Sequence, residues 1–460
     1  MKTHIIALTG FLWLFCSIPA LSQSVLPPVD SAAFESAKKD PQRLRQIANE
    51  HRGNRIGAKA QNQLGILALN SKHNDDANQS FLSVYQQYPN TPEKTDATYY
   101  LGFVQKRKEQ FDQAAAYFKE FLSNNPTGEL AEQGKYFLVR AMSEIKDPEF
   151  VTAARAFLAS QHTVTKEKDV VIQNELVRYY DEKKDYTQAL AEALKLVKEY
   201  PTSPYVHFVE GRIAEYYMLL GDMQGAINYC NALLNKYPAN TNDAARAQLM
   251  LADAYKNSKD FNRARIEYAK VGTMNPSAKD RVNAAEYYSL LLDLRDANAK
   301  KDKAAFTEVL KNLKAFVQRH PKDHHIPKAL MNIAELSRNS GNYQEALAAY
   351  DGIIQFDTSL VVTGGLHRRS KDLIEHRTLV QETHMAKGMM LRLRLHNPKA
   401  ALTEFEAVLD RNPNKTDALL NKAVCLLDLK QKNEARPILQ RLVNEGTDMK
   451  KVASQLLSIL

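Results

Sequence analysis

Small residues recur at intervals of twelve along this chain, and a proline often follows twelve residues after the second of them. Gly102, Ala114 and Pro126 form the clearest instance. Phe118 and Phe121 lie four and seven residues after Ala114, which places all three side chains on one helical face. Two helices can cross closely only where a side chain is nearly absent, and proline ends a helix because it lacks the N–H group. The spacing therefore predicts a hairpin of two helices.

The same spacing is found along most of the chain. Complete versions are Gly65 with Ala77 and Pro89, Val177 with Ala189 and Pro201, Ala214 with Ala226 and Pro238, and Ala252 with Ala264 and Pro276. Partial versions are Ala141 with Ala153, Ala334 with Ala346, Ala401 with Pro413, and Ala423 with Ala435. A helix-turn-helix period of about 34–40 residues is typical of a solenoid. We expect an all-α chain that forms a right-handed superhelical solenoid of about nine to ten such repeats.

The order Leu101-Gly102, then tyrosine, alanine, phenylalanine and proline resembles the tetratricopeptide repeat (TPR). The junctions Tyr200-Pro201 and Tyr237-Pro238 are similar to those of exported bacterial TPR proteins of the BamD and CpoB (YbgF) type, mainly over Tyr186–Pro276. The lipobox of the first type and the coiled coil of the second are missing. The resemblance implies a non-catalytic scaffold that binds protein segments during assembly or maintenance of the cell envelope.

The N-terminus reads as an export signal. Lys2 precedes an almost unbroken apolar run at Ile5–Ile18, and small residues lead to a cleavage position after Ser22. Cys16 follows Leu-Trp-Leu-Phe, whereas a lipid-acceptor cysteine needs a small residue before it. We therefore expect secretion across the inner membrane into the periplasm, with a retained membrane anchor as the alternative.

The expected order of segments combines these signals. It is a signal peptide at 1–22, a linker at 23–29, N-terminal capping helices at 30–58, a TPR solenoid at 59–357, an insert at 358–384, a C-terminal TPR pair at 385–447 and a C-terminal capping helix at 448–460.

The net charge of the chain bears on the class of partner that it binds. The net charge of +9 on 460 residues is modest, and together with the export signal it disfavours nucleic acid. Outside the signal peptide, no segment is long and apolar enough to cross a bilayer.

Cys230 and Cys425 lie five repeats apart, so we expect two inert buried thiols and no disulfide. Motifs for phosphate binding, nucleotide binding or hydrolysis are absent from the sequence, and we expect no cofactor.

The first helices of successive TPR hairpins line a concave groove, which is the surface that the resemblance implies for a protein or peptide partner. The side chains expected there are Asn62, Tyr99, Phe103, Lys106, Arg178, Lys256, Glu335 and Arg338. Arg368 and Arg369, in the basic part of the insert, are candidates for contact with an acidic partner.

Two alternatives stay open. One is an enzyme, metal-dependent or otherwise, that uses the insert at 358–375 together with nearby histidines. A small cluster of His320, Asp323, His324 and His325 could supply metal ligands, although such residues at a helix end are usually solvated. The other alternative is a structural spacer that binds through its ends.

Overall fold

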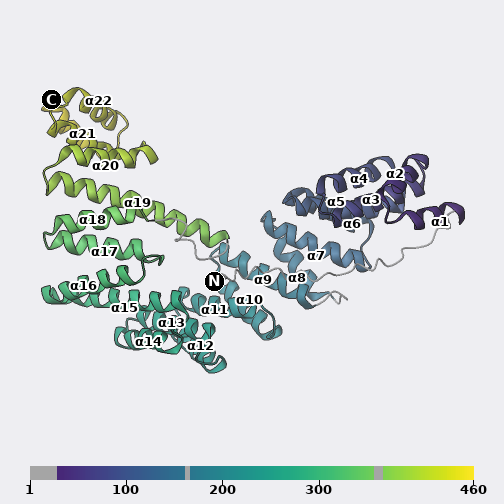
Figure 1. Cartoon of the computed structure of the whole chain (residues 1–460), viewed down its shortest axis with the longest axis horizontal. Coiled ribbons are helices and arrows are strands. Elements are labelled where there is room, and N and C mark those ends of the chain that lie inside the picture. Colours follow the sequence, from purple (N-terminus) through teal and green to yellow (C-terminus); the bar gives the residue numbers. More distant parts are fainter. Residues whose placement is uncertain (1–27, 161–165, 357–365) are drawn as a thin grey trace. The chain divides into compact units, whose positions relative to one another are not determined.

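Every described element of the chain is an α-helix (Figure 1). The computed structural model describes residues 28–160, 166–356 and 366–460, and no strand occurs among them. The all-α class and the helix-turn-helix repeat are therefore confirmed. The predicted signal peptide and residues 23–27 of the predicted linker lie outside the described residues. The chain divides into two compact units, residues 1–206 and 207–460.

The first unit contains two leading helices followed by four helix pairs. Its elements are α1 (Pro28–Ala37), α2 (Pro41–Glu50), α3 (Arg55–Asn70), α4 (Asn74–Gln87), α5 (Pro92–Arg107), α6 (Phe111–Asn124), α7 (Glu129–Glu144), α8 (Phe150–Ala159), α9 (Lys166–Glu182) and α10 (Tyr186–Glu199).

The second unit contains six helix pairs and a final short helix. Its elements are α11 (Val206–Leu219), α12 (Met223–Lys236), α13 (Asn242–Asn257), α14 (Phe261–Met274), α15 (Lys279–Lys300), α16 (Lys303–Arg319), α17 (Ile326–Asn339), α18 (Tyr343–Ile354), α19 (Leu366–Leu393), α20 (Pro398–Arg411), α21 (Thr416–Asp428), α22 (Lys432–Asn444) and α23 (Lys450–Ser458).

The small residues lie where helices cross, as the spacing predicts. Ala77 and Ala114 are fully buried. A Cβ atom added to Gly65 would lie 2.6 Å from the ring of Phe81, and one added to Gly102 would lie 2.9 Å from the ring of Phe118. Both rings are fully buried, so neither has free space into which to move. Each glycine therefore provides the space that the aromatic ring of the second helix fills.

The repeat containing α7 and α8 departs from the predicted spacing by one residue. Ala154 is fully buried, whereas Ala153 is only half-buried. The connection between Glu144 and Phe150 is longer than the connection between Arg107 and Phe111 in the preceding pair. The connection is longer because α7 ends earlier, three residues after Ala141, and α8 still starts nine residues after Ala141. The buried face of α8 is formed by Phe150, Ala154 and Phe157, and the expectation for Ala153 is corrected.

The turn inside most hairpins contains one residue with a left-handed backbone. It lies two residues before the second helix, as in Lys259 before α14 (φ +66°) and Gly341 before α18 (φ +82°). Glycine adopts this conformation freely, whereas a residue with a Cβ is strained there. Lysine therefore occupies several of these turns at an energetic cost.

Cys230 and Cys425 are buried and free, as expected. Burial raises the pKa of the Cys230 thiol to about 12 and that of Cys425 to about 11. Both thiols therefore stay protonated near neutral pH, which makes them poor nucleophiles. Over the described part of the chain, every helix is too short or too polar to span a membrane.

The predicted insert is largely helical where the structure describes it. Residues 357–365 lie outside the described part, and α19 then continues without a break from Leu366 to Leu393. The expected boundary between residues 384 and 385 thus falls inside this 28-residue helix. Helix α19 packs on α18 and α20, within the stack that α15 to α22 form in Figure 1. The segment therefore supplies the first helix of the α19–α20 pair.

Candidate functional site

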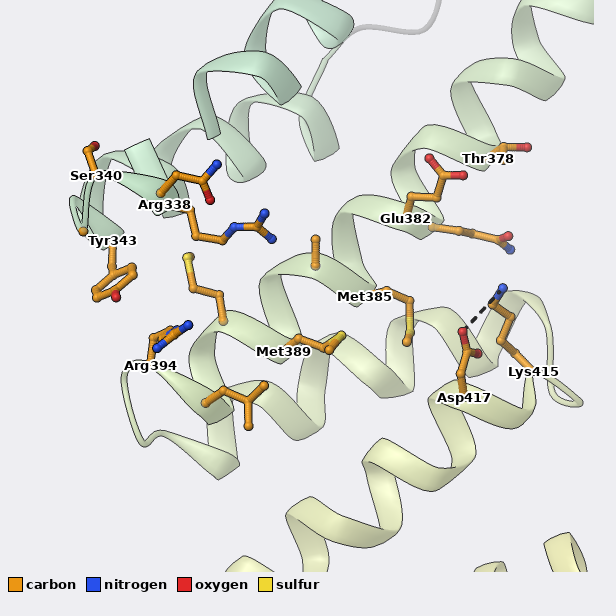
Figure 2. A pocket seen from close by; sticks show the side chains of 16 residues that line it. Arg338, Ser340, Tyr343, Thr378, Glu382, Met385, Met389, Arg394, Lys415 and Asp417 are labelled. Atoms are coloured by element: carbon orange, nitrogen blue, oxygen red, sulfur yellow. Dashed lines mark ion pairs between the residues drawn. The ribbon is translucent and has the colours of Figure 1, made fainter. Parts of the chain in front are cut away.

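A cavity of the second unit lies between the first helices of three successive pairs. Its volume is about 1070 Å³, and it is bordered by the end of α17 and the turn that follows, by one face of α19 and by the start of α21. We call it the α19 groove. Figure 2 shows Arg338 and Tyr343 on one side, Met385 and Met389 in the middle, and Lys415 with Asp417 on the other side.

The floor of the α19 groove is apolar because of the spacing of residues on α19. Met385, Met389 and Leu393 follow one another at intervals of four, so their side chains line one face of the helix. Met389 is 42% exposed and Leu393 is 49% exposed, which are high values for large apolar residues. Thr378 and Glu382 extend the same face toward the helix N-terminus. The groove thus has an apolar centre with a polar extension.

The opposite face of α19 is fixed by an ionic cluster with its neighbours. Lys387 Nζ lies 2.6 Å from Asp351 Oδ1 on α18 and 2.6 Å from Glu404 Oε1 on α20. His384 Nδ1 lies 2.7 Å from the other carboxylate oxygen of Glu404. Burial opposes ionisation of Glu404, but the hydrogen bonds from His384 and Lys387 prevail and lower its pKa. These contacts tie α19 to both adjoining helices and so fix the direction of its groove face.

A close helix contact reinforces this arrangement. A Cβ atom on Gly388 would lie 2.8 Å from the ring of Phe405 and 3.3 Å from Cβ of Glu404. Phe405 is fully buried. Gly388 and Phe405 therefore repeat in the α19–α20 pair the relation of Gly102 to Phe118. The same helix thus presents a packed back face and an open apolar front face.

The charges of the α19 groove are unevenly distributed. Arg338 and Arg394 lie toward one end, beside Tyr343, and Glu382 lies toward the other (Figure 2). None of these three side chains forms an ion pair with another described residue. Lys415 and Asp417 pair with each other, with 3.8 Å between Nζ and Oδ2. The groove therefore has two cationic groups at one end and one anionic group at the other, all open to solvent.

The sequence prediction places one residue in this groove. Arg338 lines it, whereas Glu335 is exposed on α17 without lining it. Arg368 and Arg369 belong to the first turns of α19, but their side chains lie outside the described part of the structure. Their contact with an acidic partner stays a prediction.

Two predicted groove residues of the first unit are buried instead. Asn62 is 6% exposed and donates through Nδ2 to the backbone oxygen of Glu93 at 2.8 Å. Tyr99 is 5% exposed and donates through its hydroxyl to Oε1 of Gln133 at 3.1 Å. Both side chains join neighbouring repeats, so they are structural and not available to a partner. The spacing of small residues correctly assigned Asn62 and Tyr99 to the first helices of their pairs. It did not show which side of a first helix faces the groove and which side packs on the neighbouring repeat.

Phe103 and Lys106 do lie together on α5 and are half-buried. Lys106 Nζ lies 5.7 Å from the ring centre of Phe103 and 4.9 Å from that of Phe137. Burial, with further repulsion from Arg140 and Arg107, lowers the pKa of Lys106 to about 8. This position therefore combines aromatic surface with a poorly solvated cation.

The remaining predicted cations are already engaged. Arg178 donates to Glu175 Oε2 at 3.0 Å, and Lys256 Nζ lies 2.5 Å from Asp253 Oδ1. Lys256 also lies 4.6 Å from the ring centre of Tyr288. The predicted residues therefore do not form one continuous site. They fall on both units, and only Arg338 borders the α19 groove.

The candidate metal cluster has a structural use. Ligand atoms of Asp323, His324 and His325 lie within 4.8 Å of one another. However, Asp323 Oδ1 accepts from the backbone N–H of His325 at 2.8 Å and lies 2.7 Å from its ring Nδ1, and Oδ2 accepts from Asn283 at 2.9 Å. Asp323 and His325 are buried, which corrects the expectation of a solvated turn. A metal ion would have to displace these hydrogen bonds.

Met385, Met389, Leu393 and Arg394 are absent from the sequence prediction, although they line the groove and the first three form its apolar floor. The spacing of four between the apolar residues is the signal that could have identified them. It was obscured because the predicted insert ended at residue 384, which divides α19 between two segments.

The family models agree with the repeat geometry. Models described as tetratricopeptide repeats match residues 212–240, 245–277 and 392–457. The family YfiO, described as an outer membrane lipoprotein, matches residues 58–220. This match overlaps only the beginning of the span on which the sequence resemblance to BamD was based and extends further toward the N-terminus. No curated protein matches the sequence.

Among solved structures, a tetratricopeptide repeat protein from Parabacteroides merdae is similar at 15% identity. The similarity covers 64% of this chain and 98% of that one, with a TM-score of 0.33. The Rap protein, solved in complex with competence and sporulation factor, is also similar at 15% identity. In that case the coverage is 79% of this chain and 99% of the other, with a TM-score of 0.34.

Proposed function

We propose that this chain, a member of the tetratricopeptide-repeat superfamily, is a non-catalytic scaffold of the cell envelope that holds protein segments in its α19 groove. The repeat and lipoprotein family models support a protein-binding scaffold in general. The observation that carries the more specific proposal is the apolar floor of the groove, formed by Met385, Met389 and Leu393.

Exposed apolar side chains in a concave site favour a binding role. A contiguous exposed apolar patch often marks an interaction site, whereas single exposed apolar residues are common and need no explanation. Methionine is unbranched and polarisable, so it adapts to partner side chains of different shapes. A cavity of about 1070 Å³ lies at the upper end of the range of ligand pockets, about 300–1,000 Å³, so it has room for several side chains of a protein segment. A protein segment fits these features better than a small substrate does.

The proposed compartment rests on two separate supports. The N-terminal sequence has the composition of a secretory signal peptide, and the family matched by residues 58–220 is described as an outer membrane lipoprotein. We therefore place the mature chain in the periplasm, where its partners would be proteins of envelope assembly or maintenance. Mass spectrometry of the exported protein tests the first step, with Gln23 as the expected N-terminal residue.

The scaffold role is tested by capture of envelope proteins with two matched variants. Met389→Asp introduces a charge into the floor of the α19 groove. Ile266→Asp introduces the same charge at a similarly exposed apolar residue of α14 that does not line the groove. We expect the first substitution to reduce capture and the second to leave it unchanged, with equal helicity by circular dichroism. Equal capture by both variants and the wild type would show that the groove is not the binding site.

A further inference from the structure

We infer that the ligand of the α19 groove is an amphipathic helix that places acidic side chains next to Arg338 and Arg394. This inference rests on the proposed function, because it names the chemistry of the segment that the same groove would hold.

The shape of the apolar floor matches a helix. Met385, Met389 and Leu393 lie on successive turns of α19, and helix geometry gives them a spacing of about 6 Å along the axis. A partner helix that lies along α19 repeats its own side chains at the same interval, so apolar residues four apart can cover the three positions in turn. The lining residues from Thr378 to Arg394 span about 24 Å of the helix. About sixteen residues of a partner helix would cover this length.

The charges then select the partner. Arg338 projects from the end of α17 and Arg394 lies beyond the last turn of α19, and Figure 2 shows both at the end of the groove that Tyr343 borders. Neither has a carboxylate partner among the described residues. Lys415 at the opposite end is neutralised by Asp417, and Glu382 adds an uncompensated negative charge there. A carboxylate is therefore favoured only at the arginine end.

Guanidinium groups suit this role because they bind carboxylates through two parallel hydrogen bonds. A partner helix also carries partial negative charge on its C-terminal carbonyl groups, so its C-terminal end is favoured next to the arginines. Exposed ion pairs are individually weak. Two such pairs correspond to a gain in affinity of about three- to thirtyfold.

The test uses three labelled synthetic peptides of about sixteen residues. All have leucines at intervals of four in an alanine and glutamine background, and they differ only at two positions after the last leucine, which carry Glu, Gln or Lys. Fluorescence anisotropy with the full chain measures their affinities at low and high salt. We expect the Glu peptide to bind most tightly, with a preference that shrinks as salt screens the charges.

A charge reversal supplies the matched control. In the double variant Arg338→Glu and Arg394→Glu, the Lys peptide should bind most tightly and the Glu peptide least. Both arginines are exposed, so the variant should retain the helicity of the wild type, which circular dichroism checks. The neutral Gln peptide should bind both proteins equally, because it depends only on the apolar floor.

The outcomes separate this inference from the proposed function. Equal affinity for all three peptides would overturn the acidic preference while leaving the groove as a binding site. Failure of every peptide to bind, with capture still abolished by Met389→Asp, would overturn the helical ligand. If that substitution also leaves capture unchanged, the proposed function fails as well. A dimer in sedimentation that Met389→Asp dissociates would identify a second copy of the chain as the occupant and overturn the inference.

Discussion

Replacing Gly388 by alanine tests the helix contact that fixes the direction of the α19 groove. The new Cβ atom would lie 2.8 Å from Cε1 and 2.9 Å from Cζ of Phe405. Real Cβ contacts are longer, and Phe405 is fully buried, so the ring has no solvent-exposed space to enter. Either the ring must leave its preferred rotamer or the two helices must separate.

Two opposing effects decide the magnitude. Overpacking of this kind costs about 1–3 kcal/mol. Alanine in a helix interior is more favourable than glycine by about 0.5–1 kcal/mol. We therefore expect Gly388→Ala to lower the free energy of unfolding by up to about 2.5 kcal/mol.

Gly272 provides a control in the same unit with the opposite sign. It lies in α14, and the nearest atom to its added Cβ would be Val282 Cγ1 at 3.8 Å, an ordinary contact. Gly272→Ala should therefore stabilise the protein by up to about 1 kcal/mol. Gly388→Ala should cost less when it is introduced into the Phe405→Leu variant than when it is introduced into the wild type, because the ring that the new Cβ atom would meet is then absent.

Urea unfolding followed by circular dichroism gives the overall change in stability. Repeat proteins can unfold in parts, so hydrogen exchange measured by mass spectrometry should accompany it. Faster exchange is expected in α19 and α20 of Gly388→Ala, with exchange in the first unit unchanged. If Gly388→Ala stabilises the chain as Gly272→Ala does, the close contact between α19 and α20 is wrong.

Three further predictions concern other parts of the structure. Glu404→Gln should cost about 1.5–3 kcal/mol in urea unfolding at neutral pH, because Lys387 loses one of its two carboxylate partners at a site little exposed to solvent, whereas Glu308→Gln at an exposed pair should cost less than about 1 kcal/mol. Because the folded pKa of Glu404 is lowered, its contribution is present above its unfolded pKa and is lost on acidification, so Glu404→Gln should converge toward wild type at low pH. The folded pKa of Lys106 is about 8, below its unfolded value of 10.5. The free energy of unfolding of the wild type should therefore rise relative to that of Lys106→Met as the pH increases from about 8 to 10.5. A difference that stays constant over this pH range would refute the desolvation of this amine. Lys259→Gly should stabilise the turn before α14 by about 1 kcal/mol in thermal unfolding, and a loss of stability would contradict the left-handed conformation at that residue.

The sequence predicted the helix pairs well because their contacts are local. The interval between Gly102 and Ala114 covers the end of α5, the short connection and the first turn of α6, and both residues must be small where the axes cross. The spacing could not show that Ala154 and not Ala153 lies on the buried face of α8, because the two neighbouring residues are both alanine.

The candidate site was harder to predict because it depends on which side of a first helix faces a neighbouring repeat. Tyr99, three residues before Gly102, and Arg338, four residues after Ala334, were both expected on the groove face of a first helix, yet Tyr99 is buried between repeats and Arg338 borders an open groove. Side-chain spacing gives the apolar face of α19 but does not show that α17 and α21 leave part of that face open. The position of Arg394 beside Arg338 likewise depends on packing between residues distant in sequence.

The most direct test of the account is site-specific photo-crosslinking in living cells of the source organism. A photoreactive amino acid at Met389, in the full chain with its export signal, should give discrete crosslinks to another protein, and the same group at Ile266 should not. Addition of Met385→Asp to the crosslinking chain should remove those products. Identical products from both positions, or no product from Met389, would contradict a role of the α19 groove in holding protein segments.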